Sequence, residues 1–291
     1  MTPTLLLLLA LAQPEPLPPR MPADRADGPP VVSARGWAVA DGRTGAILAA
    51  ADPPEPLAIA STTKIMTAWL VLKLAAADAT VLDEVVTFSA KAAATGGTSA
   101  KLKAGEKVTV RDLLYGLMLP SGNDAARAFA EHFAARFPAD AKDADPAAPF
   151  VAAMNREAAA LKMTNTRYLD PHGLGLNRST PRDLATLAAA ALRDELFRTV
   201  TSTRRHSCTV TAADGTTRTL VWDNTNRLLG IEGYDGVKTG TTNAAGSCLV
   251  ASGRRDGTHR IVVVLGATSN DSRYVDARNL FRFAWQLGER P

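Results

Sequence analysis

Residues 61–77 read STTKIMTAWLVLKLAAA, a stretch that is apolar on nearly every side of a helix. Such a helix is typical of the interior of a protein rather than of its surface. Ser61 and Lys64 stand at its start, three positions apart, so their side chains share one helix face. A lysine can remove the proton of a serine hydroxyl when burial or a neighbouring cation keeps the amine neutral. The stretch therefore predicts a buried helix that presents a nucleophile and its base.

Helical patterns fill the middle of the chain and strand patterns lie towards both ends. Apolar periodicity predicts helices over residues 111–118, 124–133, 150–161, 181–192 and 274–287. Turn residues between apolar runs predict a hairpin over residues 36–50. A second hairpin is predicted from strands 206–211 and 217–222, and a third from strands 247–252 and 260–267. We therefore expect an α+β fold with one antiparallel sheet built from both chain ends and a helical lobe inserted between them. A ligand-binding cleft would then lie between the sheet and the helical lobe.

Two further short motifs carry polar side chains. Ser121-Gly122-Asn123 follows an apolar helix and stands on a predicted loop between helices, where a hydroxyl can relay a proton and an amide can hold a carbonyl. Lys238-Thr239-Gly240 precedes a predicted strand. A glycine on an edge strand lets a peptide lie alongside and add its own backbone hydrogen bonds. Each motif alone is weak evidence for a site.

Composition excludes several classes of protein. The 291 residues are 46% hydrophobic and 21% charged, as in a soluble globular protein, and the net charge of +4 comes from scattered side chains. A basic footprint for nucleic acid is therefore not expected. The four histidines and the two cysteines show no metal-ligand spacing, so neither a metal site nor another cofactor is expected. Cys208 and Cys248 could form a disulfide or remain two separate buried thiols.

The N-terminal thirty residues differ from the rest. An apolar run over residues 5–11 closes on Ala10-Leu11-Ala12, a small-x-small pattern, so residues 1–12 are expected to be a signal peptide. Residues 13–30 contain seven prolines and are expected to form an extended linker. Residues 31–291 would then form one catalytic domain. We expect an exported protein of the periplasm or the extracellular cell-wall space.

The order of the three motifs resembles that of penicillin-binding proteins and class A β-lactamases. Over residues 36–287 the chain is most similar to the low-molecular-weight D-alanyl-D-alanine carboxypeptidases of peptidoglycan maturation. The matching stretches are 41–45 (DGRTG), 61–67 (STTKIMT), 112–126 (DLLYGLMLPSGNDAA), 154–155 (MN), 172–174 (HGL), 224–226 (NTN) and 236–250 (GVKTGTTNAAGSCLV). The resemblance implies a β-lactamase/penicillin-binding transpeptidase-like fold. It also implies two partners, peptidoglycan stem peptides and β-lactam antibiotics, the latter bound covalently.

The resemblance also implies the proton-transfer and acylation roles. Ser61 would attack the carbonyl between the last two D-alanines, forming an acyl-enzyme and releasing D-alanine before water hydrolyses the ester. Lys64 would be the base. Ser121 and Lys238 would complete the proton network, with the Lys238 charge helping to keep Lys64 neutral. Asn123 would hold a substrate amide.

The remaining implied roles concern substrate binding. The backbone N–H groups of Ser61 and Thr241 would form the oxyanion hole. Thr239 and Arg273 would bind the terminal carboxylate beside Gly240. His172 resembles the histidine of the family's H-G-L segment and is expected to shape its loop. The sequence ends at Pro291, directly after the predicted C-terminal helix, whose apolar side chains are interpreted as packing on the sheet, so no C-terminal membrane anchor is expected.

Three alternative functions share these motifs. A β-lactamase needs a deacylation base, and no E-x-x-L-N segment stands between Ser121 and Lys238. A peptidoglycan endopeptidase remains open, because the motifs do not determine which D-alanyl bond is cut. A non-catalytic β-lactam sensor would be acylated without turnover, but it usually has an attached signalling segment, and no second apolar stretch long enough to span a membrane is present.

Overall fold

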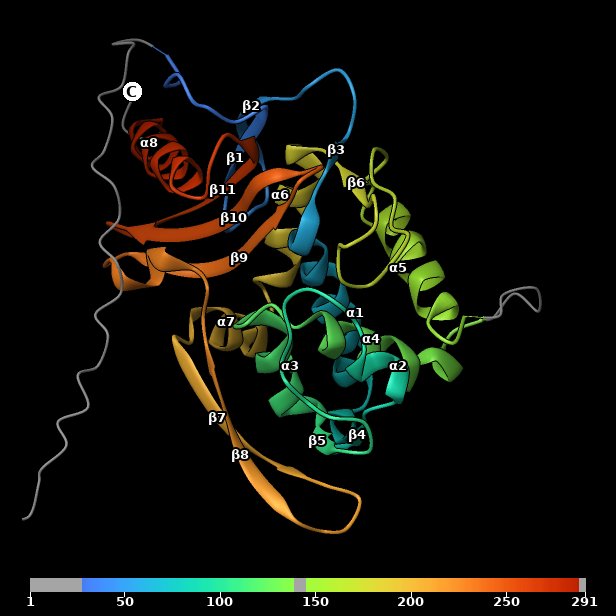
Figure 1. Cartoon of the computed structure of the whole chain (residues 1–291). Helices are drawn as coiled ribbons and strands as arrows, with labels where there is room; N and C mark the ends of the chain where they lie inside the picture. Colours follow the sequence, from blue (N-terminus) through green and yellow to red (C-terminus); the bar gives the residue numbers. More distant parts are fainter. Residues whose placement is uncertain (1–27, 139–144, 288–291) are drawn as a thin grey trace, which may run out of the picture.

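A five-stranded antiparallel sheet joins the two ends of the described chain (Figure 1). The computed structural model describes residues 28–138 and 145–287. The strands run in the order β2-β1-β11-β10-β9, with bounds Ile47–Ala51, Gly36–Asp41, Thr258–Ala267, Gly246–Arg255 and Tyr234–Thr242. The expected sheet from both chain ends is confirmed. Residues 238–240, which the sequence placed before a predicted strand, lie within the edge strand β9.

Helices cover both faces of this sheet, which explains why β11 is buried almost throughout. Alternate side chains point to opposite faces. Trp37 and Val39 of β1 pack with α8 (Ser272–Gln286), whereas Ala38 and Ala40 face the helical lobe through α6 (Pro181–Ala191). The apolar side chains of the C-terminal helix thus pack on the sheet, as the sequence predicted.

The helical lobe surrounds α1 (Lys64–Ala77). A 3₁₀ turn, η1 (Ala60–Thr63), precedes α1, so the predicted helix begins as a tighter turn at its N-terminal end. Around α1 lie the predicted helices with slightly shifted ends, α3 (Val110–Met118), α4 (Asn123–His132), α5 (Ala148–Ala160) and α6, together with α7 (Glu195–Ser202). Smaller elements are η2 (Ala79–Asp83), α2 (Ala90–Ala93), η3 (Ala134–Arg136) and η4 (Arg227–Gly230).

The hairpin of β7 (Arg205–Thr211) and β8 (Thr217–Asp223) does not join the main sheet. It belongs to a second sheet of order β4-β5-β7-β8, in which β4 is Val85–Thr87 and β5 is Lys107–Thr109. The expectation of a single sheet was therefore wrong in this part. The hairpin buries only alternate side chains, and these pack on the helical lobe instead. A third, two-stranded sheet pairs β3 (Leu57–Ala58) with β6 (Arg178–Ser179).

The two cysteines do not pair. Cys208 lies on β7 in the second sheet and Cys248 on β10 in the main sheet, and both are buried free thiols. Of the two alternatives left open by the sequence, the disulfide is therefore wrong. The predicted signal peptide and all but the last residues of the predicted linker lie outside the described residues. Within the described part of the chain, none of the helices has the length and apolar character needed to cross a membrane.

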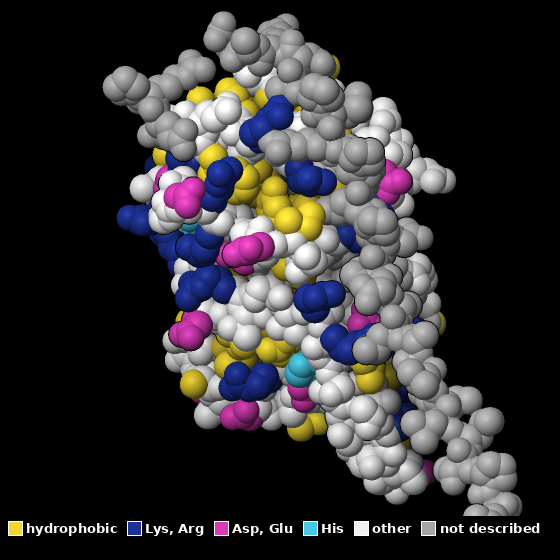
Figure 2. Space-filling model, turned by 90° about the vertical axis from the view of Figure 1, so that its left-hand side faces the viewer, with side chains coloured by type: hydrophobic (Ala, Val, Ile, Leu, Met, Phe, Trp, Pro, Cys, Tyr) yellow, Lys and Arg dark blue, Asp and Glu magenta, His cyan; other side chains and the backbone are white. Residues whose placement is uncertain are grey.

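One face of the molecule carries more basic than acidic side chains (Figure 2). An open groove of about 580 Å³ lies between the start of β9, the end of β10 and α8. Arg254 and Arg255 border it from the strand, and Arg278 and Arg282 from the helix. Arg254 is paired with Asp235 at 2.9 Å, so part of this positive charge is neutralised locally.

Candidate active site

The nucleophile candidate sits on the 3₁₀ turn at the start of α1. Side chains three residues apart eclipse one another in a 3₁₀ turn. Ser61 belongs to η1, and Lys64 is the first residue of α1. The Lys64 Nζ lies 2.9 Å from the Ser61 Oγ, within hydrogen-bond distance. The structure thus brings together the first two residues that the sequence singled out.

Lys64 is fully buried and has two further partners. Its Nζ donates to the Asn123 Oδ1 at 2.6 Å and to the His172 backbone carbonyl at 2.8 Å. Burial lowers the Lys64 pKa from 10.5 to about 7, because desolvation disfavours the charged amine; the negative charges of Asp170 and Asp124 oppose this shift. Lys64 therefore exchanges its proton near neutral pH, which suits a general base.

Asn123 is held from the opposite side by a loop of the helical lobe. It is the first residue of α4, and its Nδ2 donates to the Gly96 carbonyl at 2.8 Å. Its backbone nitrogen donates to the Thr98 carbonyl, also at 2.8 Å. Ser121, two residues earlier, is buried, and its carbonyl accepts from the Thr98 hydroxyl at 2.6 Å. Residues 96–98 thus fix the second predicted motif at the N-terminus of α4.

The third predicted motif brings the edge strand β9 against the Ser61 turn. A Cβ added at Gly240 would lie 2.9 Å from the Ser61 backbone nitrogen, which leaves room only for glycine. Lys238 on the same strand is also fully buried, and its pKa is lowered well below 10.5 by burial and by the charges of Lys64 and Arg273. The charge of Lys64 thus disfavours a proton on Lys238, whereas the Lys64 pKa is lowered by burial.

Arg273 reaches the same strand from the first turn of α8. Its Nη1 donates to the Thr241 hydroxyl at 2.9 Å and to the Gly240 carbonyl at 3.2 Å. Thr239 instead shares a 2.8 Å hydrogen bond with the Thr225 hydroxyl. The guanidinium is therefore beside the predicted substrate strand, with Thr241 as its direct hydroxyl partner. The Arg273 Nε is buried without a hydrogen-bond partner among the described residues.

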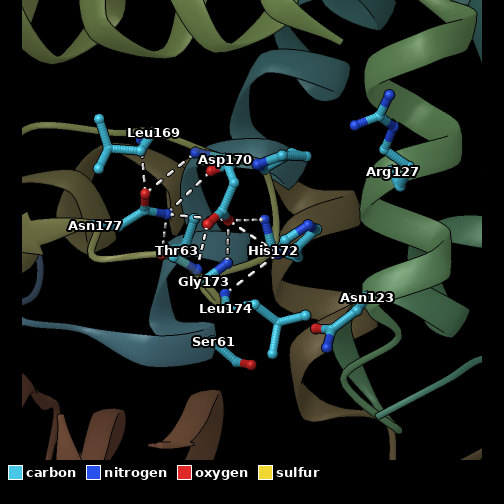
Figure 3. A network of polar contacts seen from close by, with 12 residues as sticks. Ser61, Thr63, Asn123, Arg127, Leu169, Asp170, His172, Gly173, Leu174 and Asn177 are labelled. Atoms are coloured by element: carbon cyan, nitrogen blue, oxygen red, sulfur yellow. Dashed lines mark hydrogen bonds and ion pairs between the residues drawn. The ribbon is translucent and has the colours of Figure 1, made fainter. Parts of the chain in front are cut away.

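Sequence reasoning missed a polar network behind Lys64. Figure 3 shows Asp170, His172 and Asn177 converging beside the turn that carries Ser61. The Asp170 Oδ1 lies 3.0 Å from the His172 Nδ1 and accepts the His172 backbone N–H at 2.8 Å. His172 therefore shapes its loop, as expected, and it also supplies a carbonyl to Lys64. The only signal in the sequence was the clustering of Asp, Asn and Gly around the H-G-L segment.

Residues 23–269 match the family model described as D-alanyl-D-alanine carboxypeptidase. The chain belongs to this family. The D-alanyl-D-alanine carboxypeptidase of Streptomyces sp. (strain K15) is 38% identical over 274 residues, covering 91% of this chain and 91% of that protein. DacC of Escherichia coli is 34% identical over 89% of this chain, which spans only 63% of that longer relative. A D-alanyl-D-alanine endopeptidase of Pseudomonas aeruginosa is also 34% identical, over 84% of this chain and 75% of its own length.

Solved structures of the D-alanyl-D-alanine carboxypeptidase family share the fold. The Streptomyces K15 DD-transpeptidase superposes with a TM-score of 0.79 at 37% identity, covering 89% of this chain and 99% of that one. The D-alanyl-D-alanine carboxypeptidase DacD of Francisella tularensis superposes with a TM-score of 0.75 at 30% identity, covering 94% of this chain and 74% of that one. The penicillin-binding α+β fold and the serine DD-peptidase class expected from the sequence are thereby confirmed. The roles of individual site residues stay predictions.

Proposed function

We propose that this enzyme hydrolyses the terminal D-alanyl-D-alanine bond of peptidoglycan stem peptides through an acyl-enzyme on Ser61. The observation that supports this most directly is the 2.9 Å contact between the Ser61 hydroxyl and Lys64, a buried amine with a pKa of about 7. Near neutral pH a large fraction of such an amine is unprotonated and can accept the serine proton. Family members act on this class of substrate.

The proposed reaction has two steps. Lys64 takes the Ser61 proton as the hydroxyl oxygen attacks the carbonyl of the penultimate D-alanine, and the backbone N–H groups of Ser61 and Thr241 stabilise the oxyanion. Collapse breaks the peptide bond, and the D-alanine amine leaves after receiving a proton through Lys64, Ser121 and Lys238. Water then attacks the ester, gives its proton to the same network and restores the Ser61 hydroxyl.

Substrate recognition would rest on the edge strand. A peptide beside β9 could pair its backbone with the strand, with Asn123 holding a substrate amide. Arg273, together with Thr239 and Thr241, would bind the terminal carboxylate. The guanidinium already donates to the Thr241 hydroxyl, and Thr241 is exposed, so a carboxylate at this point would meet both groups.

The proposal includes the cellular context expected from the sequence. Residues 1–12 would direct export, residues 13–30 would be a linker, and residues 31–291 would be the catalytic domain in the periplasm or the cell-wall space. β-Lactams would acylate Ser61 because they present an activated amide to the same nucleophile. An endopeptidase is the second candidate, since relatives with that name share 34% and 30% identity with this chain.

Intact mass measured over time after addition of benzylpenicillin tests the proposal. We expect the mass of one penicillin to be added, with the adduct mapped to Ser61 and lost slowly. Ser61→Ala should show no adduct. An adduct on another residue, or rapid hydrolysis of penicillin without an accumulating adduct, would overturn the assignment. Release of free D-alanine from a pentapeptide, compared with cleavage of a cross-linked dimer, separates the carboxypeptidase from the endopeptidase.

A further inference from the structure

A single carboxylate organises the loop behind Lys64. The Asp170 Oδ1 accepts the backbone N–H groups of His172, at 2.8 Å, and of Gly173, while its Oδ2 accepts that of Gly175 at 2.6 Å (Figure 3). The Asp170 side chain is only 15% exposed. A carboxylate that accepts several backbone N–H groups strongly favours one loop conformation, because each of these donors would otherwise need another partner.

Asn177 ties the other end of this loop to the nucleophile turn. Its Oδ1 accepts the backbone N–H groups of Leu169, at 2.7 Å, and of Asp170, at 3.2 Å. Its Nδ2 donates to the hydroxyl of Thr63, which lies between Ser61 and Lys64, at 3.0 Å. The Asn177 side chain is fully buried. The loop is therefore closed on itself and attached to the turn that carries Ser61.

The loop backbone packs directly on this turn. Gly173 has a φ of +93°, and a Cβ placed there would lie 2.0 Å from the Ala60 carbonyl oxygen, so a side chain cannot be accommodated without moving the loop. Next to Gly173, the His172 carbonyl accepts the Lys64 amine at 2.8 Å. The position of this acceptor thus depends on the loop conformation that Asp170 stabilises.

We propose that Asp170 is a positioning residue for Lys64: its carboxylate folds residues 170–175 so that the His172 carbonyl holds the lysine amine against the Ser61 hydroxyl. This inference rests on the proposed function of Lys64 as the base. Asp170 touches neither Ser61 nor Lys64 through a direct hydrogen bond, so it acts through the loop and through its charge.

The charge of Asp170 adds a second effect. Burial drives the Lys64 pKa downwards, and the negative charges of Asp170 and Asp124 oppose this. The other charged or titratable groups near Lys64 are Lys238, whose own pKa is lowered by burial and by the Lys64 charge, and the imidazole of His172 on the loop itself. Without Asp170, Lys64 would remain deprotonated to lower pH but would be a weaker base towards Ser61.

Two substitutions separate the loop effect from the charge effect. Asp170→Asn removes the charge and keeps an Oδ1 that can accept from His172 and Gly173, but its amide nitrogen cannot accept from the Gly175 N–H. Asp170→Ala removes the charge and all three acceptors. Leu176→Ala is the matched control, because this side chain is 53% exposed on the same loop and makes none of the contacts described above. The measurement is the second-order rate constant for acylation by benzylpenicillin as a function of pH, with thermal unfolding of each variant.

We expect the acidic limb of the acylation profile to move to lower pH in both Asp170 variants. The plateau rate should fall by about tenfold to a hundredfold in Asp170→Ala, the cost typical of misplacing a reacting group by about 1 Å, and much less in Asp170→Asn. Leu176→Ala should match the unmodified enzyme. An unchanged limb and plateau in Asp170→Asn would overturn the charge effect, and an Asp170→Ala plateau equal to that of Asp170→Asn would overturn the positioning effect.

A further readout keeps this inference separate from the function on which it rests. The Lys64 side chain can be titrated by NMR in the unmodified protein and in Asp170→Asn, with Lys64→Arg to assign the signal. A lower Lys64 pKa in Asp170→Asn supports the charge effect even if Ser61 is never acylated, whereas an unchanged pKa contradicts that effect. If Asp170→Ala does not fold, Asp170→Asn tests the positioning effect through the lost Gly175 acceptor: a lowered plateau supports it and a wild-type plateau rejects it, while the Lys64 titration decides the charge effect.

Discussion

Gly240 on the edge strand lies directly against the backbone of Ser61. A Cβ at Gly240 would be 2.9 Å from the Ser61 nitrogen, 3.0 Å from the Thr62 nitrogen and 3.1 Å from the Ile59 carbonyl oxygen. All three atoms belong to the backbone and cannot rotate away as a side chain can. The distance between the nucleophile and the strand that would bind the substrate is therefore set by the absence of one methyl group.

We predict that Gly240→Ala separates β9 from the Ser61 turn and lowers the rate of acylation by penicillin by about tenfold to a hundredfold. Gly230→Ala is the control, because a Cβ at that position would have no heavy atom within 4 Å. Stopped-flow acylation kinetics and thermal unfolding should be measured on both variants. A Gly240→Ala enzyme with the unmodified acylation rate would show that this close approach does not matter for the reaction.

The buried state of Lys64 predicts a specific pH dependence. Below a pH of about 7 the amine carries a proton and cannot accept that of Ser61, so the acylation rate should rise as the pH increases through about 7 and then level off. Lys64→Ala should abolish most of the rate. Lys73→Ala, on the same helix but with a side chain 47% exposed, should leave the profile unchanged. A profile that rises only near 10.4, the usual lysine value, would contradict a neutral Lys64.

Recognition of the terminal carboxylate by Arg273 can be measured with two peptides. We predict that the enzyme releases D-alanine from a free-acid peptide and processes the C-terminally amidated analogue poorly. Arg273→Ala should reduce this discrimination by about 1.5 to 3 kcal/mol, or roughly one to two orders of magnitude in kcat/KM. Arg282→Ala, further along the same helix, should retain it. Equal use of both peptides by the unmodified enzyme would favour the endopeptidase.

The two cysteines should be chemically silent in the folded protein. Burial raises the thiol pKa to about 12 for Cys208 and to about 11 for Cys248, so almost no reactive thiolate is present at neutral pH. We expect no reaction with a thiol reagent in native buffer and reaction of both thiols after denaturation, with no reduction step needed. A mass increase upon reduction of the purified protein would instead reveal a disulfide.

Local patterns in the sequence were sufficient to predict the elements that carry the site. The all-round apolar character of α1 predicted its burial, and the turn residues between β10 and β11 predicted two strands of the main sheet. The second sheet was missed because β4 and β5 have only three residues each, too few for a periodic pattern. The pairing of β5 with β7 joins Lys107 to Thr211, far away in sequence, and it depends on the finished lobe rather than on local preference.

Within the site, the sequence predicted side chains but not backbone contacts. The Ser61–Lys64 pair follows from a spacing of three residues, and the structure brings it together. The contact of Lys64 with the His172 carbonyl joins positions 108 residues apart, and any residue type can supply a backbone carbonyl. No motif could therefore reveal it. The loop network of Asp170 has the same origin, since it is built largely from backbone N–H groups.

The order of strands in the main sheet makes its completion depend on contacts between segments far apart in sequence. β1 lies between β2 and β11, and Ser33, just before β1, binds the Asp276 carboxylate 243 residues later in the chain. The strand β11, which flanks β1, therefore comes from the far end of the described chain, long after the Ser61 turn in sequence. Until β11 pairs with it, β1 has an unpaired edge that can bind other strands. Contacts of such long sequence separation slow folding.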